Sequence, residues 1–375
     1  MEKINRSNCI LDNSSPITDL YTFKNFPINM GCTNQDREKD LFADMVWGYS
    51  ANGIVQLKEL LPLELLYSDS HSPGTTGKTW QLHHENFSKF MEKDIDSKNI
   101  LEIGGASGLL VDNFLKTDKK FKWDIVEPSH QAFNDNRITH YKILFEDFKK
   151  NLKYDTVIHS HLFEHVYNPI HFLLKINKVL KTDGFQYISL PNMPHWLSNS
   201  YSNSLNFEHT YYYDQDILEN LFSKTGFKIL DYKTSKHSIF IKTKKITDID
   251  TITYQDIKIK VNSKDIFKNY VKDLKETIKK IKKMSSSVEK TFLFGAHIFS
   301  QKLFNIGLQE SLVYGILDNN KDKQGKRLYG TNKLVYEPEI ISNENNILVV
   351  VKAGAYTNEI IDQINIINDK AKIIS

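Results

Sequence analysis

Short apolar runs alternate with segments of helical spacing along two stretches of this 375-residue chain. The first stretch extends from about residue 86 to residue 245, and the second from about residue 290 to residue 375. This alternation is typical of parallel sheets in which each strand is followed by a helix. We therefore predict an α/β fold with two Rossmann-like regions, the first of which is the larger.

The same pattern divides the whole chain into four parts. Scattered aromatic residues, several prolines and weak periodicity over residues 1–85 predict a small, irregular N-terminal domain. We expect the larger α/β domain over residues 86–250, a helical linker over 251–289 and the smaller α/β domain over 290–375. The linker contains "KDLKETIKKIKKM", in which lysines and apolar residues alternate at helical spacing. We interpret this run as a solvated amphipathic helix rather than a stripe that binds nucleic acid or a membrane.

The overall charge is nearly balanced, at +3. It therefore favours no polyanionic partner, and we expect no contact with nucleic acid. No run of about 18 apolar residues and no signal-peptide pattern is visible, so we expect a cytoplasmic protein without membrane contact, as a monomer or homodimer. Cys9 and Cys32 are the two cysteines, too few for a disulfide framework or for a zinc site made of four thiolates.

A glycine-rich turn lies in "NILEIGGASGLLVDNFL", residues 99–115. An apolar strand is predicted to end at Ile103 and a helix to begin near Leu109. The turn between them contains three glycines: Gly104, Gly105 and Gly108. Glycine lets a backbone take positive φ and approach a ligand closely. The next strand, in "KWDIVEPS", ends at Glu127, whose carboxylate is spaced to bind the hydroxyls of a ribose.

The turn differs from a dinucleotide-binding fingerprint, because it reads G-G-x-x-G and Glu102 precedes it. An acidic residue there suits a ligand with a cationic amino acid moiety better than a pyrophosphate. The segment resembles motif I of the class I S-adenosylmethionine-dependent methyltransferases, and this resemblance implies S-adenosyl-L-methionine as the cofactor. It also implies that Asp147, in "FEDF", contacts the adenine and that His161, after the strand in "YDTVIHS", lines the donor pocket.

The segment "NFEHTYYYDQ", residues 206–215, follows the predicted fifth strand, "GFQYISLPN". Ligands of open α/β sheets lie beyond the carboxyl ends of the strands, so a segment inserted here lies over the methyl donor. We therefore expect Glu208 and His209 near the transferable methyl group. We expect the three tyrosines that follow to divide between packing and contact with substrate.

Several segments resemble the three-domain sugar-nucleotide C-methyltransferases: "FEHTYYY", "GIVQLKELLPLELLYSDSHSPGTTGKTW", "FGAHIFSQKLFN" and "GILDNNKDKQGKRLYGT". The resemblance implies a sugar-nucleotide substrate and C-methylation of a keto-sugar in glycan biosynthesis. It implies His209 as the catalytic base, Glu208 as its carboxylate neighbour and His165 as a further active-site histidine. O-methylation or N-methylation of a sugar would use the same groups and stays open. A non-catalytic scaffold is disfavoured, because every donor-site residue named above is present.

Two departures from that family change the expectations. Its N-terminal domain holds zinc through two C-x-x-C pairs, but here the first pair is Cys9 and Asp12 and the second is Tyr49 and Asn52, so we expect no metal. The stretch "SHSPGTT" replaces a tyrosine-rich one, with His71 as a candidate substitute. This change leaves the acceptor atom open.

The second α/β region follows the same plan as the first: strand, glycine turn, helix, and a strand that ends in a carboxylate. Its turn, in "FLFGAHIFSQ", has one glycine, Gly295, and its next strand ends at Asp318. A second nucleotide site and a purely structural role both fit this pattern.

Overall fold

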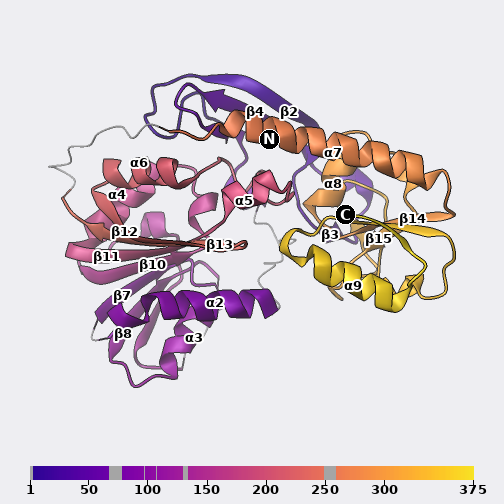
Figure 1. Cartoon of the computed structure of the whole chain (residues 1–375). Helices are drawn as coiled ribbons and strands as arrows, with labels where there is room; N and C mark the ends of the chain where they lie inside the picture. The colour runs from indigo at the N-terminus through magenta and orange to yellow at the C-terminus, as the bar shows by residue number, and fades with distance from the viewer. Residues whose placement is uncertain (1–2, 67–77, 97, 107, 130–133, 249–258) are drawn as a thin grey trace.

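The computed structural model describes residues 3–66, 78–96, 98–106, 108–129, 134–248 and 259–375 (Figure 1). His71 lies outside the described residues. These residues form two α/β sheets and three smaller sheets, and the long helix α7 (Ser263–Ser285) runs across the upper right of the view in Figure 1. The predicted α/β class is confirmed.

The larger sheet has seven strands, which we give in their spatial order: β12 (Phe227–Thr234), β13 (Ser238–Lys245), β11 (Leu180–Pro191), β10 (Tyr154–Ser160), β7 (Lys98–Ile103), β8 (Phe121–Val126) and β9 (Ile138–Tyr141). Strands β11, β10, β7, β8 and β9 are parallel, and β13 is antiparallel to both of its neighbours. The strand order reverses between β7 and β10. In open α/β sheets a ligand binds at such a switch point, beyond the carboxyl ends of the strands.

Helices cover both faces of this sheet (Figure 1). One face packs against α2 (Lys78–Met91) and α3 (Leu109–Leu115), and the other against α4 (Pro169–Val179) and α6 (Gln215–Lys224). The two faces bury separate apolar clusters, because successive strand residues point to opposite sides. The predicted strand end at Ile103 and helix start near Leu109 are both confirmed.

The N-terminal region contains more regular structure than its weak periodicity indicates. Strands β2 (Ile17–Pro27), β4 (Phe42–Ser50) and β5 (Val55–Leu57) form an antiparallel sheet. The register between β2 and β4 shifts twice, so the alternation of apolar and polar residues breaks along β2. The remaining short strands pair as β1 (Ile4–Asn5) with β6 (Glu59–Leu60) and β3 (Cys32–Thr33) with β16 (Arg327–Leu328).

The C-terminal sheet is parallel throughout. Its strands are, in spatial order, β17 (Val335–Tyr336), β15 (Gly315–Leu317), β14 (Lys290–Phe294), β18 (Ile347–Val351) and β19 (Lys372–Ile374). Helices α8 (Ile298–Asn305) and α9 (Thr357–Ile367) belong to this region. The order is that of a small Rossmann-like sheet, as the sequence predicts.

The remaining helices are short. They are α1 (Leu63–Leu66), α5 (Met193–Ser198) and the 3-10 turns η1 (Arg37–Lys39), η2 (Glu92–Asp94), η3 (Phe145–Asp147), η4 (Phe163–His165), η6 (Glu310–Leu312), η7 (Pro338–Ile341) and η8 (Gly354–Tyr356). Helix α7 is amphipathic, with buried Phe267, Tyr270, Leu274 and Ile278 at helical spacing. Among the residues that the structure describes, no helix combines the length and the apolar character needed to cross a membrane.

Candidate active site

The first glycine turn has a backbone that other residues would not tolerate. Gly104 and Gly108 both have a φ of 73°, in the left-handed region. A Cβ on Gly104 would lie 3.2 Å from a methyl group of Leu162, and one on Gly105 would lie 2.7 Å from a methyl group of Ile125. Positive φ and close packing therefore both require glycine in this turn.

Two carboxylates flank the turn. Glu102 is buried, and its Oε2 accepts a hydrogen bond of 2.8 Å from the indole nitrogen of Trp123. Burial raises the pKa of Glu102 to about 7, with a further contribution from Glu127 and against the effect of the Trp123 hydrogen bond. Glu127 follows β8, and its two oxygens accept from the backbone nitrogens of Ala106 at 3.3 Å and Ser129 at 2.9 Å. The arrangement fits a ligand with an ammonium group near one carboxylate and hydroxyls near the other.

The two other predicted donor-site residues occupy different places. Asp147 is exposed at the end of η3, whose Phe145 ring packs against Phe172 of α4 at a centroid distance of 5.4 Å. His161 follows β10 with a φ of 48°, and its backbone nitrogen donates to the Ser189 carbonyl at 2.9 Å. Positive φ in a residue other than glycine is uncommon and often marks a functional position.

Three histidines from different elements meet at the Ser238 hydroxyl. Its oxygen lies 3.0 Å from His83 Nδ1, 3.2 Å from His161 Nε2 and 2.7 Å from His237 Nδ1. Burial lowers the pKa of all three imidazoles, so they are neutral near pH 7. Each of these three ring nitrogens has the Ser238 hydroxyl as its hydrogen-bond partner.

The predicted base, His209, has a defined tautomer. Its Nδ1 lies 2.8 Å from the Asn203 carbonyl and 3.2 Å from the Ser204 carbonyl. A carbonyl oxygen only accepts, so Nδ1 carries the proton and Nε2 keeps its lone pair. Burial lowers the pKa of His209, and the Glu164 carboxylate acts in the opposite direction. The result is a neutral imidazole with one basic nitrogen.

Asn206 shapes the segment that carries Glu208 and His209. Its side-chain oxygen accepts from the backbone nitrogens of Glu208 at 2.7 Å and His209 at 3.0 Å. This is the local hydrogen bonding by which asparagine replaces a backbone turn. We did not predict a role for Asn206, although an asparagine two residues before the Glu-His pair is the signal for such a turn.

Carboxylates and imidazoles form a continuous group around His165. Its Nδ1 lies 3.8 Å from Glu208 Oε2, its Nε2 lies 3.9 Å from Glu164 Oε1, and its ring centroid lies 4.8 Å from that of His209. Glu208 therefore approaches His165, whereas backbone carbonyls hold the His209 ring. The predicted residues Glu208, His209 and His165 are brought together.

Glu164 was missed by the sequence analysis. It is 1% exposed, and its Oε1 also lies 3.4 Å from His161 Nδ1. Burial raises the pKa of Glu164 to about 7, as it does that of Glu208. Within the described part of the chain, Glu164 Oε2 has no hydrogen-bond partner. Its position beside His165 in "LFEHV" was the available signal.

The three tyrosines correct our expectation that one of them reaches substrate, because Tyr211, Tyr212 and Tyr213 are all fully buried. The segment lies along β5: the Leu57 nitrogen donates to the Thr210 carbonyl and the Tyr212 nitrogen to the Val55 carbonyl, both at 2.8 Å. Their role is to fix the Glu-His pair against the N-terminal sheet.

In the second glycine turn, the carboxylate that ends the following strand, Asp318, is hydrogen-bonded to the turn itself. Asp318 Oδ2 accepts from the Ala296 backbone nitrogen at 2.8 Å and lies 3.2 Å from Lys323 Nζ, while Oδ1 accepts from the Asn320 nitrogen at 2.9 Å. These contacts occupy the carboxylate that a nucleotide ribose would need.

The positions that correspond to the zinc ligands of the resembling family also contact one another. The Asn52 amide donates to Asp12 Oδ2 and, at 3.2 Å, to the Ser15 hydroxyl. Asp12 Oδ1 accepts from the backbone nitrogens of Ser14 and Ser15, both at 2.9 Å. Hydrogen bonds therefore connect the two loops that zinc connects in that family.

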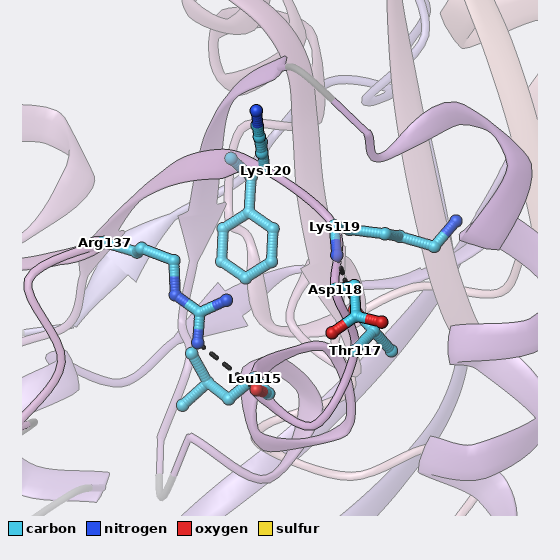
Figure 2. Close-up of a pocket in the computed structure, with 7 residues that line it drawn as sticks. Leu115, Thr117, Asp118, Lys119, Lys120 and Arg137 are labelled. Carbon is cyan, nitrogen blue, oxygen red and sulfur yellow. Dashed lines mark hydrogen bonds between the residues drawn. The ribbon is translucent and has the colours of Figure 1, made fainter.

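An open hollow of about 470 Å³ lies at the end of the larger sheet opposite to the glycine turn, beside the first residue of β8 (Figure 2). Figure 2 shows Arg137 directed to the Leu115 carbonyl at one side of this hollow. It lies at the amino ends of the strands, away from the glycine turn and the Glu-His pair, so it takes no part in the site.

Two family models match the chain. Residues 80–232 match a methyltransferase domain, and residues 234–375 match a C-methyltransferase C-terminal domain. The two matches together leave only the N-terminal region and residue 233 uncovered. No curated protein matches this sequence.

Solved structures show only distant similarity. One is the 1,6-didemethyltoxoflavin-N1-methyltransferase of Burkholderia thailandensis with bound S-adenosylhomocysteine: 13% identity over 45% of this chain and 80% of that chain, with a TM-score of 0.37. Another is the N-methyltransferase NodS of Bradyrhizobium japonicum WM9 with S-adenosylhomocysteine: 10% identity over 44% and 87% of the chains, with a TM-score of 0.35. Scores this low carry no argument about function.

Proposed function

Because the chain belongs to the class I S-adenosylmethionine-dependent methyltransferases and ends in a C-methyltransferase C-terminal domain, we propose that it methylates a carbon of a nucleotide-linked keto-sugar in bacterial glycan biosynthesis. The observation that carries the proposal is the His209 ring, whose Nδ1–H is held by two carbonyls so that Nε2 is the basic atom. S-adenosylmethionine is the methyl donor, and the methyl acceptor is a small molecule.

The donor site that we propose is built around the first glycine turn. Glu127 binds the ribose hydroxyls, and its present partners are exchangeable backbone nitrogens at 2.9 and 3.3 Å. Glu102 faces the ammonium group of the amino acid moiety, Asp147 contacts the adenine and His161 lines the pocket. The glycines let the backbone approach the ligand where a Cβ would not fit. When bound, the donor supplies an electrophilic methyl group on a sulfonium sulfur.

His209 acts as a general base in the proposed mechanism. Its Nε2 removes the proton from a carbon next to the ketone of the sugar, and the electron pair of that C–H bond moves to give an enolate. The enolate carbon then forms the new bond to the methyl group, in line with the departing sulfur. Neutral histidine suits this step because its ordinary pKa lies near the working pH. The carboxylate of Glu164, whose charge raises the pKa of His209, stabilises the imidazolium that results, and Glu208 contacts the neighbouring His165.

O-methylation is the second candidate. His209 would then take the proton of a sugar hydroxyl, and the oxygen would attack the methyl group. N-methylation of an amino sugar would use the same arrangement. The match of residues 234–375 to a C-methyltransferase C-terminal domain favours carbon as the acceptor.

The test is the variant His209→Asn, assayed with nucleotide-linked keto-sugars. We expect a loss of about 10²- to 10⁴-fold in rate, the usual contribution of a positioned general base. In deuterated water without donor, the wild-type protein should exchange the proton at the target carbon, and His209→Asn should not. The matched control is His171→Asn on the exposed face of α4, which should behave as wild type.

Glu208→Gln should cost less, because it removes a negative charge beside His165 and leaves the proton acceptor, His209, in place. Full activity of His209→Asn would show that another group is the base. Methyl transfer without any base-dependent exchange of the C–H proton would favour the oxygen acceptor.

A further inference from the structure

A lysine from the C-terminal region reaches the segment that precedes the Glu-His pair. Lys302, on α8, is fully buried. Its Nζ donates to the carbonyls of Ser202 and Leu205, both at 2.8 Å, and lies 2.7 Å from the Tyr270 hydroxyl on α7. The two carbonyls are 100 and 97 residues away in sequence, so this contact joins α8 of the C-terminal region to the loop that follows α5.

The turn between those carbonyls is the one that holds His209. The outer carbonyls, of Ser202 and Leu205, point to Lys302. The inner carbonyls, of Asn203 and Ser204, accept from His209 Nδ1. One four-residue turn therefore connects the lysine amine to the imidazole, and the direction of its carbonyls determines which ring nitrogen carries the proton.

We propose that Lys302 is a positioning residue that fixes the His209 tautomer by orienting the turn formed by residues 202–205. The inference rests on the proposed role of His209 as base. It gives the C-terminal region a defined part in catalysis, because Lys302 supplies the N–H groups that bind the Ser202 and Leu205 carbonyls.

Lys302 can donate hydrogen bonds to the Ser202 and Leu205 carbonyls in either protonation state. Burial lowers the pKa of Lys302 well below its ordinary value. The described groups to which Nζ is hydrogen-bonded are two carbonyls and a hydroxyl, none of them a carboxylate. An ammonium group has three N–H donors for the three oxygens. A neutral amine still donates to both carbonyls and accepts from the Tyr270 hydroxyl.

Packing alone does not account for an amine at this site. Burying an amine costs free energy that an apolar side chain of similar length avoids, and such a replacement is often neutral or stabilising when the partners are satisfied in another way. The aromatic rings of Tyr270 and Phe23, with centroids 4.9 and 5.8 Å from Nζ, would pack equally well against an apolar chain. The polar function of Lys302 is therefore directed at the turn.

The experiment compares Lys302→Met with wild type by NMR of the full chain labelled with ¹⁵N-histidine, with His209 assigned from its loss in His209→Asn. In wild type we expect the proton on Nδ1. In Lys302→Met we expect a mixture in which the Nε2–H form is populated. With keto-sugar substrate, kcat should fall by about 100-fold, the usual effect of a small misplacement of a catalytic group, with KM and the affinity for S-adenosylhomocysteine unchanged.

The control is Tyr270→Phe, which removes one partner of Lys302 and leaves both carbonyl contacts. The His209 signals should then match those of wild type. An unchanged His209 tautomer in a folded Lys302→Met would overturn the proposal, and so would an equal shift in Tyr270→Phe. If Lys302→Met does not fold, the wild-type spectrum decides: Nδ1–H supports the proposal and Nε2–H overturns it.

The NMR result is separate from the test of the base. An active His209→Asn would refute His209 as the base, whatever Lys302→Met does to the ring. An inactive His209→Asn with an unchanged ring in Lys302→Met would refute only the positioning role.

Discussion

The two glycine turns of this protein share a strand–turn–helix–strand order. They differ in the hydrogen-bond and ion-pair partners of the carboxylate that follows the second strand. In the larger sheet, Glu127 accepts from the turn at 3.3 Å, through Ala106, and from Ser129. In the C-terminal sheet, Asp318 accepts from the turn at 2.8 Å and has Lys323 as an ion-pair partner. The turn hydrogen bond of Asp318 is buried, as suits a structural element, whereas both backbone hydrogen bonds of Glu127 are exposed, which leaves this acid accessible to a ligand.

The surroundings of the second turn reinforce this difference. On the helix that follows it, the Gln301 amide donates to the carbonyls of Asn29 at 2.7 Å and Tyr329 at 2.9 Å. The same helix presents Lys302 to the segment that carries His209. A shared strand–turn–helix plan therefore does not imply a shared function: in the mechanism that we propose, the first turn approaches the methyl donor and the second supports the segment that carries His209.

The largest expected effect comes from adding a methyl group to each turn. Gly104→Ala places a Cβ 3.2 Å from Leu162 at a φ of 73°, where the backbone approaches the donor. We expect about a 100-fold loss of affinity for S-adenosylhomocysteine by calorimetry, or about 2.7 kcal/mol. Gly295→Ala meets no atom within 4 Å but has a φ of 104°. It should lose about 1–3 kcal/mol of stability and keep its affinity. Equal affinities in the two variants would remove the distinction between the turns.

The two acids provide the next comparison. Glu127→Ala removes hydrogen bonds to the ribose, and we expect about a tenfold to 50-fold weaker binding of S-adenosylhomocysteine at nearly unchanged stability. Asp318→Ala leaves backbone donors of its own turn without their acceptor and should cost about 1–3 kcal/mol in the free energy of unfolding, measured in urea. A loss of donor affinity in Asp318→Ala would contradict the structural role.

The affinity for S-adenosylhomocysteine should rise about tenfold between pH 6 and pH 8. Burial raises the pKa of Glu102 to about 7, so the free protein holds this carboxyl protonated below that pH. A ligand ammonium group favours the carboxylate, so binding releases a proton below pH 7 and affinity rises as the pH increases. Calorimetry should show this rise in wild type and a flat profile in Glu102→Gln. The buried Glu164 and Glu208 are common to both proteins, so a rise that persists in Glu102→Gln would assign the effect to them.

The smallest expected effect is on stability and comes from the N-terminal loops, where polar side chains are hydrogen-bonded to one another as they are in the second turn. Asn52→Ala removes the donor to Asp12 and Ser15, and thermal unfolding should show a loss of about 1 kcal/mol. Asn34→Ala, at an exposed position, should have no effect. A metal chelator should leave wild-type stability unchanged, and a lower melting temperature with chelator would reveal metal ligands elsewhere in the chain.

Sequence patterns predicted the elements that local signals determine. The end of β7 and the start of α3 follow from an apolar run and from glycines that lie next to one another in the chain. The N-terminal sheet was harder to predict, because two register shifts within β2 break the alternation on which strand prediction depends.

The parts of the candidate site that were missed depend on distant contacts. Glu164 is an ordinary polar residue in the sequence, and it becomes a buried carboxyl only when the distant segment that carries His209 packs beside it. Lys302 reads as one of many lysines, and its partners lie about a hundred residues away. The three tyrosines were expected to divide between packing and contact with substrate, whereas pairing of their segment with β5 buries all of them.

The crystal structure of the complex with S-adenosylhomocysteine would test the central claim most directly. The account predicts one ligand per chain, with its ribose hydroxyls on Glu127, its amino group near Glu102 and its sulfur facing His209. Asp318 should keep its contacts with Ala296 and Lys323. A ligand bound at Gly295, with its ribose on Asp318 and the first turn unchanged, would contradict the account.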